Sequence, residues 1–230
     1  MTVPSTPGWT EFWDAKATSV TDFQATGRGL MDIVGFLYTV REVMRLLALR
    51  PSDVLVDVGC GTGLIALAMA PWLNHIYAID LSPNMVKRAR RNLSHVGNVE
   101  VALGSITRMD LSDHCCERVL AYSVLQYLDG EEGAGQSFRE LFRVLRPGGR
   151  ALLAANPDPA RRGALEQVIR ARPDQEAADR ELALQDSLSW IAADRLCALA
   201  REAGFRARSE AISERIWQHF YMFDLVLEKP

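Results

Sequence analysis

The sequence predicts a doubly wound α/β fold, in which a mostly parallel sheet carries helices on both faces. From residue 53 onward, short apolar runs rich in β-branched residues alternate with segments of helical length. Between Val54 and Val58 the first run is apolar except for Asp57, as expected for a strand buried on both faces. It leads directly into the glycine cluster at residues 59–63, where a strand-to-helix turn is expected. Together these observations favour parallel strands joined by helices.

Bulk composition narrows the function before any motif is considered. The 230 residues suffice for one sizeable domain, and 48% of them are hydrophobic. A net charge of -3, with acids and bases interspersed, lacks the basic excess of nucleic-acid binders, so we expect no nucleic-acid partner. We also expect no membrane partner and a cytoplasmic location, because neither a leader pattern nor a spanning apolar run is visible. The four cysteines and four histidines lack ligand spacing, which predicts no metal site.

The first fifty residues precede the alternating pattern. Residues 1–29 carry several aromatic side chains among polar ones, which predicts an arm that packs on the rest of the chain. Residues 30–49 show apolar residues at helical spacing, and Pro51 ends that helix.

Strands and helices then follow in order. We expect five strands, at 53–58, 75–80, 99–104, 117–123 and 150–156, with helices at 64–73, 82–96 and 137–145. Ser82 as N-cap and Pro83 at the first helical position mark the start of the second of these helices. The Pro-Gly-Gly at 147–149 is expected to stop the third.

The last third of the chain departs from this pattern. Residues 157–187 are rich in Ala, Arg, Glu and Asp and predict a largely solvated helical insertion. A helix at 190–205 precedes two strands, 206–212 and 220–229, that no helix separates, so they pair antiparallel at one end of the sheet. We expect a single domain, made of the arm and first helix (1–49), a core (50–156), the insertion (157–190) and the closing elements (191–230).

The glycine cluster predicts a ligand site. Gly59 and Gly61 let the backbone turn tightly and lie against a ligand, and the following helix presents free N–H groups. Asp80 ends the second strand, 21 residues after Gly59, where a carboxylate can accept two hydrogen bonds from a ribose diol. The spacing G-x-G-x-G differs from the dinucleotide pattern G-x-G-x-x-G, whose third position here is Leu64. Asp57 suits a ligand that carries a cation better than a pyrophosphate, although a nucleotide, or a turn without a ligand, remains possible at this point.

Four segments together carry a family resemblance. "VLVDVGCGTG", "AIDLSPNMV", "LGSI" and "LRPGGRALLA" resemble the class I S-adenosylmethionine-dependent methyltransferases, from about residue 50 to the C-terminus. The resemblance implies a Rossmann-like sheet of seven strands, with the last strand antiparallel and inserted between the fifth and sixth. It also implies S-adenosylmethionine as the cofactor.

The resemblance assigns cofactor-binding roles by position. Asp57, Gly59, Cys60 and Gly61 match the loop around the methionine portion of the cofactor, and Asp80 matches the acid that binds the ribose hydroxyls.

The remaining matches concern the adenine and the cofactor's amino group. Leu81 matches the apolar residue beside the adenine. Ser105 and Ile106 match the turn after the third strand, where relatives often carry an acid, so Ser105 is a departure. Tyr122 matches the end of the fourth strand, which usually faces the cofactor's amino group. In the arm, we expect Arg28 to pair with the cofactor's carboxylate beneath an aromatic lid.

No catalytic base stands out. Methyl transfer from a sulfonium needs an aligned nucleophile, and needs a base only for weakly acidic or protonated acceptors. Gln126 stands where many relatives carry histidine, and it cannot act as a base. Tyr127 and His219 are the candidate catalytic residues, although the pattern favours a core aromatic for Tyr127 and a structural or surface histidine for His219.

The sequence therefore predicts methyl transfer to a small-molecule acceptor at oxygen, nitrogen or carbon. Two alternatives stay open. One is a non-catalytic cofactor-binding or regulatory member of the same fold, because fold alone does not fix function. The other is a nicotinamide-dependent oxidoreductase. The acceptor's identity and the oligomeric state are not encoded in any pattern we can read.

Overall fold

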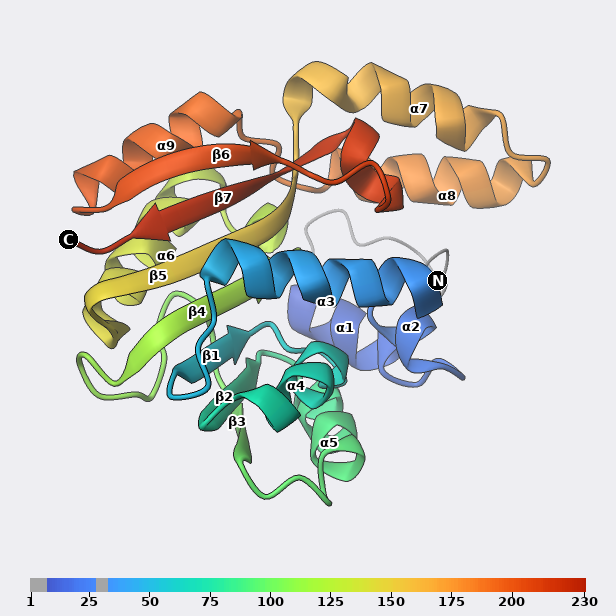
Figure 1. Ribbon diagram of the computed structural model, residues 1–230. Coiled ribbons are helices and arrows are strands. Elements are labelled where there is room, and N and C mark those ends of the chain that lie inside the picture. The colour runs from blue at the N-terminus through green and yellow to red at the C-terminus, as the bar shows by residue number, and fades with distance from the viewer. Residues whose placement is uncertain (1–7, 28–32) are drawn as a thin grey trace.

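Seven strands form one sheet in the computed structural model, which describes residues 8–27 and 33–230 (Figure 1). The strand order is β3-β2-β1-β4-β5-β7-β6. The strands are β1 (Val54–Val58), β2 (His75–Asp80), β3 (Val99–Leu103), β4 (Cys116–Tyr122), β5 (Leu145–Pro157), β6 (Arg206–Ala211) and β7 (Met222–Glu228).

The pairing confirms the predicted fold class. Strands β1 to β5 pair in parallel, whereas β7 lies between β5 and β6 and runs antiparallel to both. The parallel strands end on the same side of the molecule, and this is the side where ligands bind in open α/β sheets.

Helices cover both faces of the sheet. One face is covered by α3 (Ile33–Leu47), α4 (Leu64–Met69) and α5 (Pro83–Asn92), and the other by α6 (Gly130–Val144) and α9 (Ala193–Glu202). Successive strand residues alternate between the two cores: Leu55 packs in the α3–α5 layer, and its neighbour Val56 packs in the α6–α9 layer. This alternation explains why a central strand such as β1 is apolar on both of its faces.

Two boundaries differ most from the sequence prediction. Helix α6 begins at Gly130 rather than at residue 137, because its first two turns are small and acidic and carry no apolar stripe. Acids in the first turn suit the helix dipole. Strand β5 begins at Leu145, so the Pro-Gly-Gly segment lies within the strand rather than before it.

The insertion forms a pair of helices, α7 (Arg162–Arg170) and α8 (Gln175–Asp186), that pack on each other at the C-terminal side of the sheet (Figure 1). Leu165, Ile169 and Ala178 form a small separate core there with Tyr221. Most other residues of the insertion are exposed or half-buried, so it is helical and largely solvated, as predicted, apart from this small core.

The N-terminal arm contains α1 (Trp9–Lys16) and α2 (Asp22–Ala25), and it docks on α5. Asp14 on α1 accepts hydrogen bonds from the Ser82 hydroxyl and from the main-chain N–H of Asn84, at the N-terminus of α5. Arg88 donates to two main-chain carbonyls that follow α1 and to the Asp22 carboxylate, at 2.7 Å. The arm is thus held by polar contacts to a single helix.

Within the two described ranges, no helix has the length and apolarity needed to cross a bilayer. The same residues contain no group of three metal-ligating side chains, and all four cysteines are free thiols.

Candidate cofactor and acceptor site

A cavity of about 300 Å³ lies at the C-terminal ends of the parallel strands, at the lower end of the range for ligand pockets. Its first wall comes from the turns after β1, β2, β3 and β4. Its second wall comes from α1, α8 and two short 3-10 helices, η2 (Leu125–Tyr127) and η4 (Trp217–Phe220). Figure 1 shows α1 and α8 on the side where the strands end. The cavity therefore joins the sheet to the arm and the insertion.

The glycine loop approaches both walls closely. Gly59 and Gly61 line the cavity and have φ values of +76° and +58°, which other residues adopt only with strain. A Cβ on Gly59 would lie 2.4 Å from the side chain of Val124, and one on Gly61 would lie 2.8 Å from that of Thr26 in the arm. The loop thus tolerates no side chain at either position.

Asp80 holds the loop and faces the cavity. Its Oδ2 accepts from the Gly61 N–H at 2.7 Å, and its Oδ1 accepts from the Ser82 N–H at 2.9 Å. The side chain is almost fully buried, and burial raises the pKa of the carboxyl above its usual range. Each oxygen can accept at least one further hydrogen bond, so two adjacent hydroxyl groups would complete the site. Asp80 therefore fits a ribose diol.

The remaining predicted residues of the first wall are distributed around Asp80. Leu81, Ser105, Ile106 and Tyr122 all line the cavity. The hydroxyl of Ser105 lies 2.9 Å from that of Thr107 and accepts from the Thr107 N–H at 3.3 Å, so it also holds its own turn.

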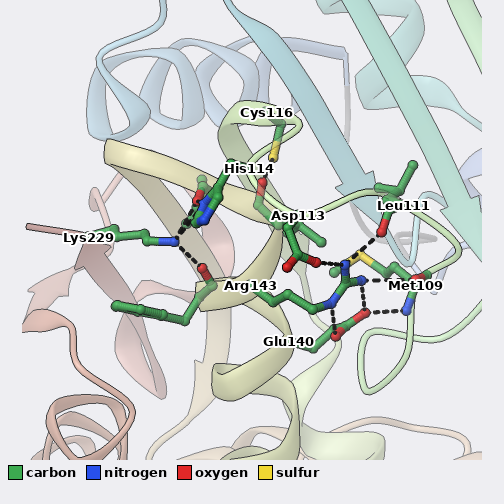
Figure 2. A network of polar contacts seen from close by, with 11 residues as sticks. Met109, Leu111, Asp113, His114, Cys116, Glu140, Arg143 and Lys229 are labelled. Carbon is green, nitrogen blue, oxygen red and sulfur yellow. Dashed lines mark hydrogen bonds and ion pairs between the residues drawn. The ribbon is translucent and has the colours of Figure 1, made fainter.

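Arg143, on α6, fixes the segment that follows this turn (Figure 2). It donates to the carbonyls of Met109 and Leu111, at 3.1 and 2.7 Å, and to the carboxylates of Asp113 and Glu140, both at 2.7 Å. Glu140 also accepts from the Met109 N–H at 2.6 Å. These contacts clamp residues 109–113 to α6.

Two predicted cofactor residues, Asp57 and Cys60, are described by the structure but do not line the cavity. Asp57 is buried behind the glycine loop near the end of β1. The Cys60 thiol is buried, and burial, together with the charges of Asp57 and Asp80, raises its pKa, so it is a neutral packing group. Arg28 lies outside the described residues.

Aromatic residues of the arm close the second wall. The rings of Trp9 and Trp13 meet the ring of Tyr127 edge-on, with centroids 4.8 and 5.2 Å apart, and all three residues line the cavity. His219, the other candidate catalytic residue, is not among the lining residues, although its neighbours Trp217 and Gln218 are.

The insertion contributes lining residues that were not among the predicted site residues. Glu181, Leu184, Gln185 and Leu188 line the cavity and follow the spacing i, i+3, i+4 and i+7. This spacing indicates one face of a helix and was readable in the sequence, but the abundance of charged residues around it masked the stripe.

The fold and the site together define a class of protein. An antiparallel seventh strand between the fifth and sixth, a glycine loop after β1 and a buried acid at the end of β2 match what the sequence resemblance implied for class I methyltransferases. Comparison with known proteins agrees. Residues 56–153 match the family model described as a methyltransferase domain. The matched segment includes the glycine loop and Asp80, so this part of the chain is a methyltransferase domain.

Individual relatives are more distant. The chain is 28% identical over 170 residues to an arsenite methyltransferase of Halobacterium salinarum, covering 70% of this chain and 39% of that one. It spans between 26% and 39% of the length of the first curated relatives that it matches.

Two solved structures share the fold along nearly the whole chain. The N-methyltransferase NodS of Bradyrhizobium japonicum, in complex with S-adenosylhomocysteine, has a TM-score of 0.69 at 13% identity, covering 97% of this chain and 100% of that one. The 4+2 cyclase SpnF has a TM-score of 0.72 at 18% identity, covering 99% and 98%. At these identities the likeness concerns the fold.

Proposed function

We propose that the chain transfers a methyl group from S-adenosylmethionine to a small-molecule acceptor bound between α1, α8 and η4. One observation carries the proposal: a single cavity joins the Asp80 and glycine-loop wall to a second wall built by the arm and the insertion. Relatives named as methyltransferases of arsenite, phosphoethanolamine and malonyl-acyl-carrier protein are consistent with an acceptor that enters such a cavity.

The first wall would hold the cofactor. Asp80 would accept from the ribose hydroxyls, the loop at Gly59 and Gly61 would lie along the methionine end, and Leu81 and Ile106 would flank the adenine. Bound there, the cofactor supplies a methyl group on a positively charged sulfur. Asp57, buried behind the same loop, contributes negative charge close to that cation.

The second wall would align the acceptor and exclude water. Positioning alone supplies about 7–11 kcal/mol in favourable intramolecular reactions, and Trp9 and Trp13 of the arm shield the cavity from solvent. Among the described residues that line it, the titratable groups on the acceptor side are Lys16, Tyr127, Glu181 and Tyr221, and there is no histidine. We therefore place any proton transfer on Tyr127 or Glu181 rather than on His219.

Calorimetry with S-adenosylhomocysteine and with NAD tests the cofactor part of the proposal. We expect S-adenosylhomocysteine to bind in the micromolar range and NAD to bind at least about 100-fold more weakly, because the loop lacks the third glycine of the dinucleotide pattern. Tighter binding of NAD would replace the proposal with the oxidoreductase alternative.

A screen of small-molecule acceptors with a methyl-labelled donor tests turnover. We expect label to appear in an acceptor and S-adenosylhomocysteine to accumulate in equal amount. Tight binding of S-adenosylhomocysteine without labelled product from any acceptor would favour the non-catalytic member of the fold.

A further inference from the structure

We infer that the acceptor is a neutral ring compound bearing hydroxyl or carbonyl groups, and that Gln185, Gln218 and Trp217 recognise it. This inference deepens the proposed function, since it names the acceptor class of the same cavity. We call the second wall of the cavity, built by α1, α8, η2 and η4, the acceptor wall. The inference rests on polar atoms of this wall that have no hydrogen-bond partner among the described residues, on the charge of the wall and on its aromatic lining.

Four polar groups of the acceptor wall are buried without a hydrogen-bond partner among the described residues. They are the side-chain oxygens of Gln126, Gln185 and Gln218 and the indole N–H of Trp217. The three glutamines are at most 9% exposed. Unpartnered buried polar atoms are rare in native proteins, and four in one cavity wall indicate that a ligand completes them.

Two of these groups have a fixed hydrogen-bonding sense. The Gln185 amide nitrogen donates to the Glu181 carboxylate at 3.0 Å, which orients the amide and leaves its oxygen as an acceptor. The Trp217 indole can only donate. The amides of Gln126 and Gln218 can turn either way. The wall therefore requires a ligand that both donates and accepts, as hydroxyl and amide groups do.

The charge of the wall argues against anionic acceptors. Phosphate and carboxylate groups are recognised by paired cations, above all by the arginine fork. Among the described lining residues, the acceptor wall offers one base, Lys16, whose ammonium lies 5.9 Å from the ring centre of Phe12, and one acid, Glu181. No described arginine lines the cavity.

The aromatic lining favours a ring. Trp9, Trp13 and Tyr127 meet edge-on around the cavity, and Trp217 and Tyr221 lie in the wall supplied by η4 and the start of β7. Aromatic faces and edges stack on planar ligands with a preference that goes beyond area burial. A planar ring with neutral polar substituents satisfies both the rings and the orphaned polar atoms.

Matched ligand pairs test the charge preference. Binding is measured by calorimetry on the full chain saturated with S-adenosylhomocysteine, using 4-hydroxybenzamide against 4-hydroxybenzoate and phenol against phenyl phosphate. We expect each neutral compound to bind about tenfold or more tightly than its charged partner. Equal or tighter binding of the charged partners, or no binding of either neutral compound, would overturn the inference.

Conservative variants test the named residues. Trp217→Phe keeps the ring and removes the N–H, and Gln218→Met keeps the length and removes the amide. We expect each to weaken 4-hydroxybenzamide about five- to twentyfold and to leave S-adenosylhomocysteine affinity unchanged. The controls are Trp72→Phe and Gln167→Met, at exposed positions that do not line the cavity. Unchanged affinity for the amide in both cavity variants would remove these residues from recognition.

A melting curve of the free variants gives a second readout. Because each substitution removes an unpartnered buried polar group, we expect the melting temperature to stay level or rise, whereas loss of a structural hydrogen bond would lower it. Failure of S-adenosylhomocysteine to bind the unmodified chain would instead refute the proposed function, and the same ligand pairs, measured on the free chain, would then judge the cavity.

Discussion

Two polar clusters of this protein differ in how completely their groups are paired. Around Arg143, the guanidinium meets two carbonyls and two carboxylates, and Glu140 also accepts from the main chain (Figure 2). In the acceptor wall, the oxygens of Gln126, Gln185 and Gln218 have no partner among the described residues.

This difference in pairing distinguishes polar groups that stabilise the fold from polar groups that are available to a ligand. A fully paired network rigidifies the segment it holds, while a half-paired one costs stability unless something else completes it. The Arg143 cluster fixes residues 109–113, and the acceptor wall remains incomplete until a ligand binds. Polar-to-apolar substitutions in the two clusters should accordingly have opposite effects on folding.

Asp80 tests the ligand side of the comparison with the largest expected effect. Asp80→Asn replaces one carboxylate oxygen by an amide nitrogen. That oxygen can accept hydrogen bonds both from the main chain and from a ligand hydroxyl, whereas the nitrogen can only donate. We expect S-adenosylhomocysteine affinity to fall by about 2–3 kcal/mol, roughly 30- to 150-fold, measured by calorimetry. The exposed Asp179→Asn serves as the control. An unchanged dissociation constant would show that Asp80 does not bind the cofactor.

Arg143 tests the structural side. Arg143→Met leaves two carbonyls and the largely buried Glu140 without their donor, so we expect the free energy of unfolding to drop by about 2 kcal/mol in urea titrations. The matched control is Arg139→Met, at an exposed position on the same helix. A drop no larger than the control's would mean that the cluster adds nothing to stability.

Asp224 is intermediate between the fully paired Arg143 cluster and the unpaired amide oxygens of the acceptor wall. It accepts from the Ala155 N–H at 2.8 Å, but burial raises the pKa of its carboxyl to about 6, so its ionised form costs stability. The pKa of Asp224 in the folded protein is above the unfolded value of about 3.9. The stability that the neutral carboxyl gives the folded protein is therefore fully present below about pH 4 and is lost as pH rises through about 6.

Asp224→Asn should remove this pH dependence. We expect the variant to be more stable than the parent by about 2 kcal/mol at pH 8, with the difference disappearing at pH 4. Urea titrations at the two pH values measure it. A difference that does not change with pH would show that Asp224 is ionised in the folded protein at little cost.

Gln126 gives the smallest effect and the opposite sign to Arg143. Gln126→Met removes one orphaned oxygen from the acceptor wall, so we expect the free protein to gain between 0 and about 1 kcal/mol of stability. Thermal unfolding measures the shift. A loss of more than about 1 kcal/mol would mean that the amide is already satisfied, and it would break the distinction between the two clusters.

Local patterns predicted the elements whose cause is local. The continuous apolar runs predicted the parallel strands, and the glycine spacing predicted the tight turn after β1, because these features depend on a few neighbouring residues. The start of α6 escaped prediction because Gly130 and its successors pack through small side chains that give no apolar period.

Tertiary pairing explains the rest. Nothing local distinguishes the orphaned oxygen of Gln185 from the exposed amide of Gln167, because burial and the missing partner arise only once α8 meets α1 and η4. For the same reason the sequence pattern favoured His219 as a candidate, whereas in the structure its neighbours Trp217 and Gln218 line the cavity.

Ser82 has a consequence for the order and speed of ligand exchange. Its N–H donates to Asp80, in the cofactor wall, and its hydroxyl donates to Asp14, on the helix that closes the cavity. This one residue therefore links the Asp80 side of the cavity to α1, whose aromatic residues line the opposite side. We therefore expect release of the used cofactor, rather than the transfer step, to set the turnover rate, with the residence time of the product determined by how often the arm detaches.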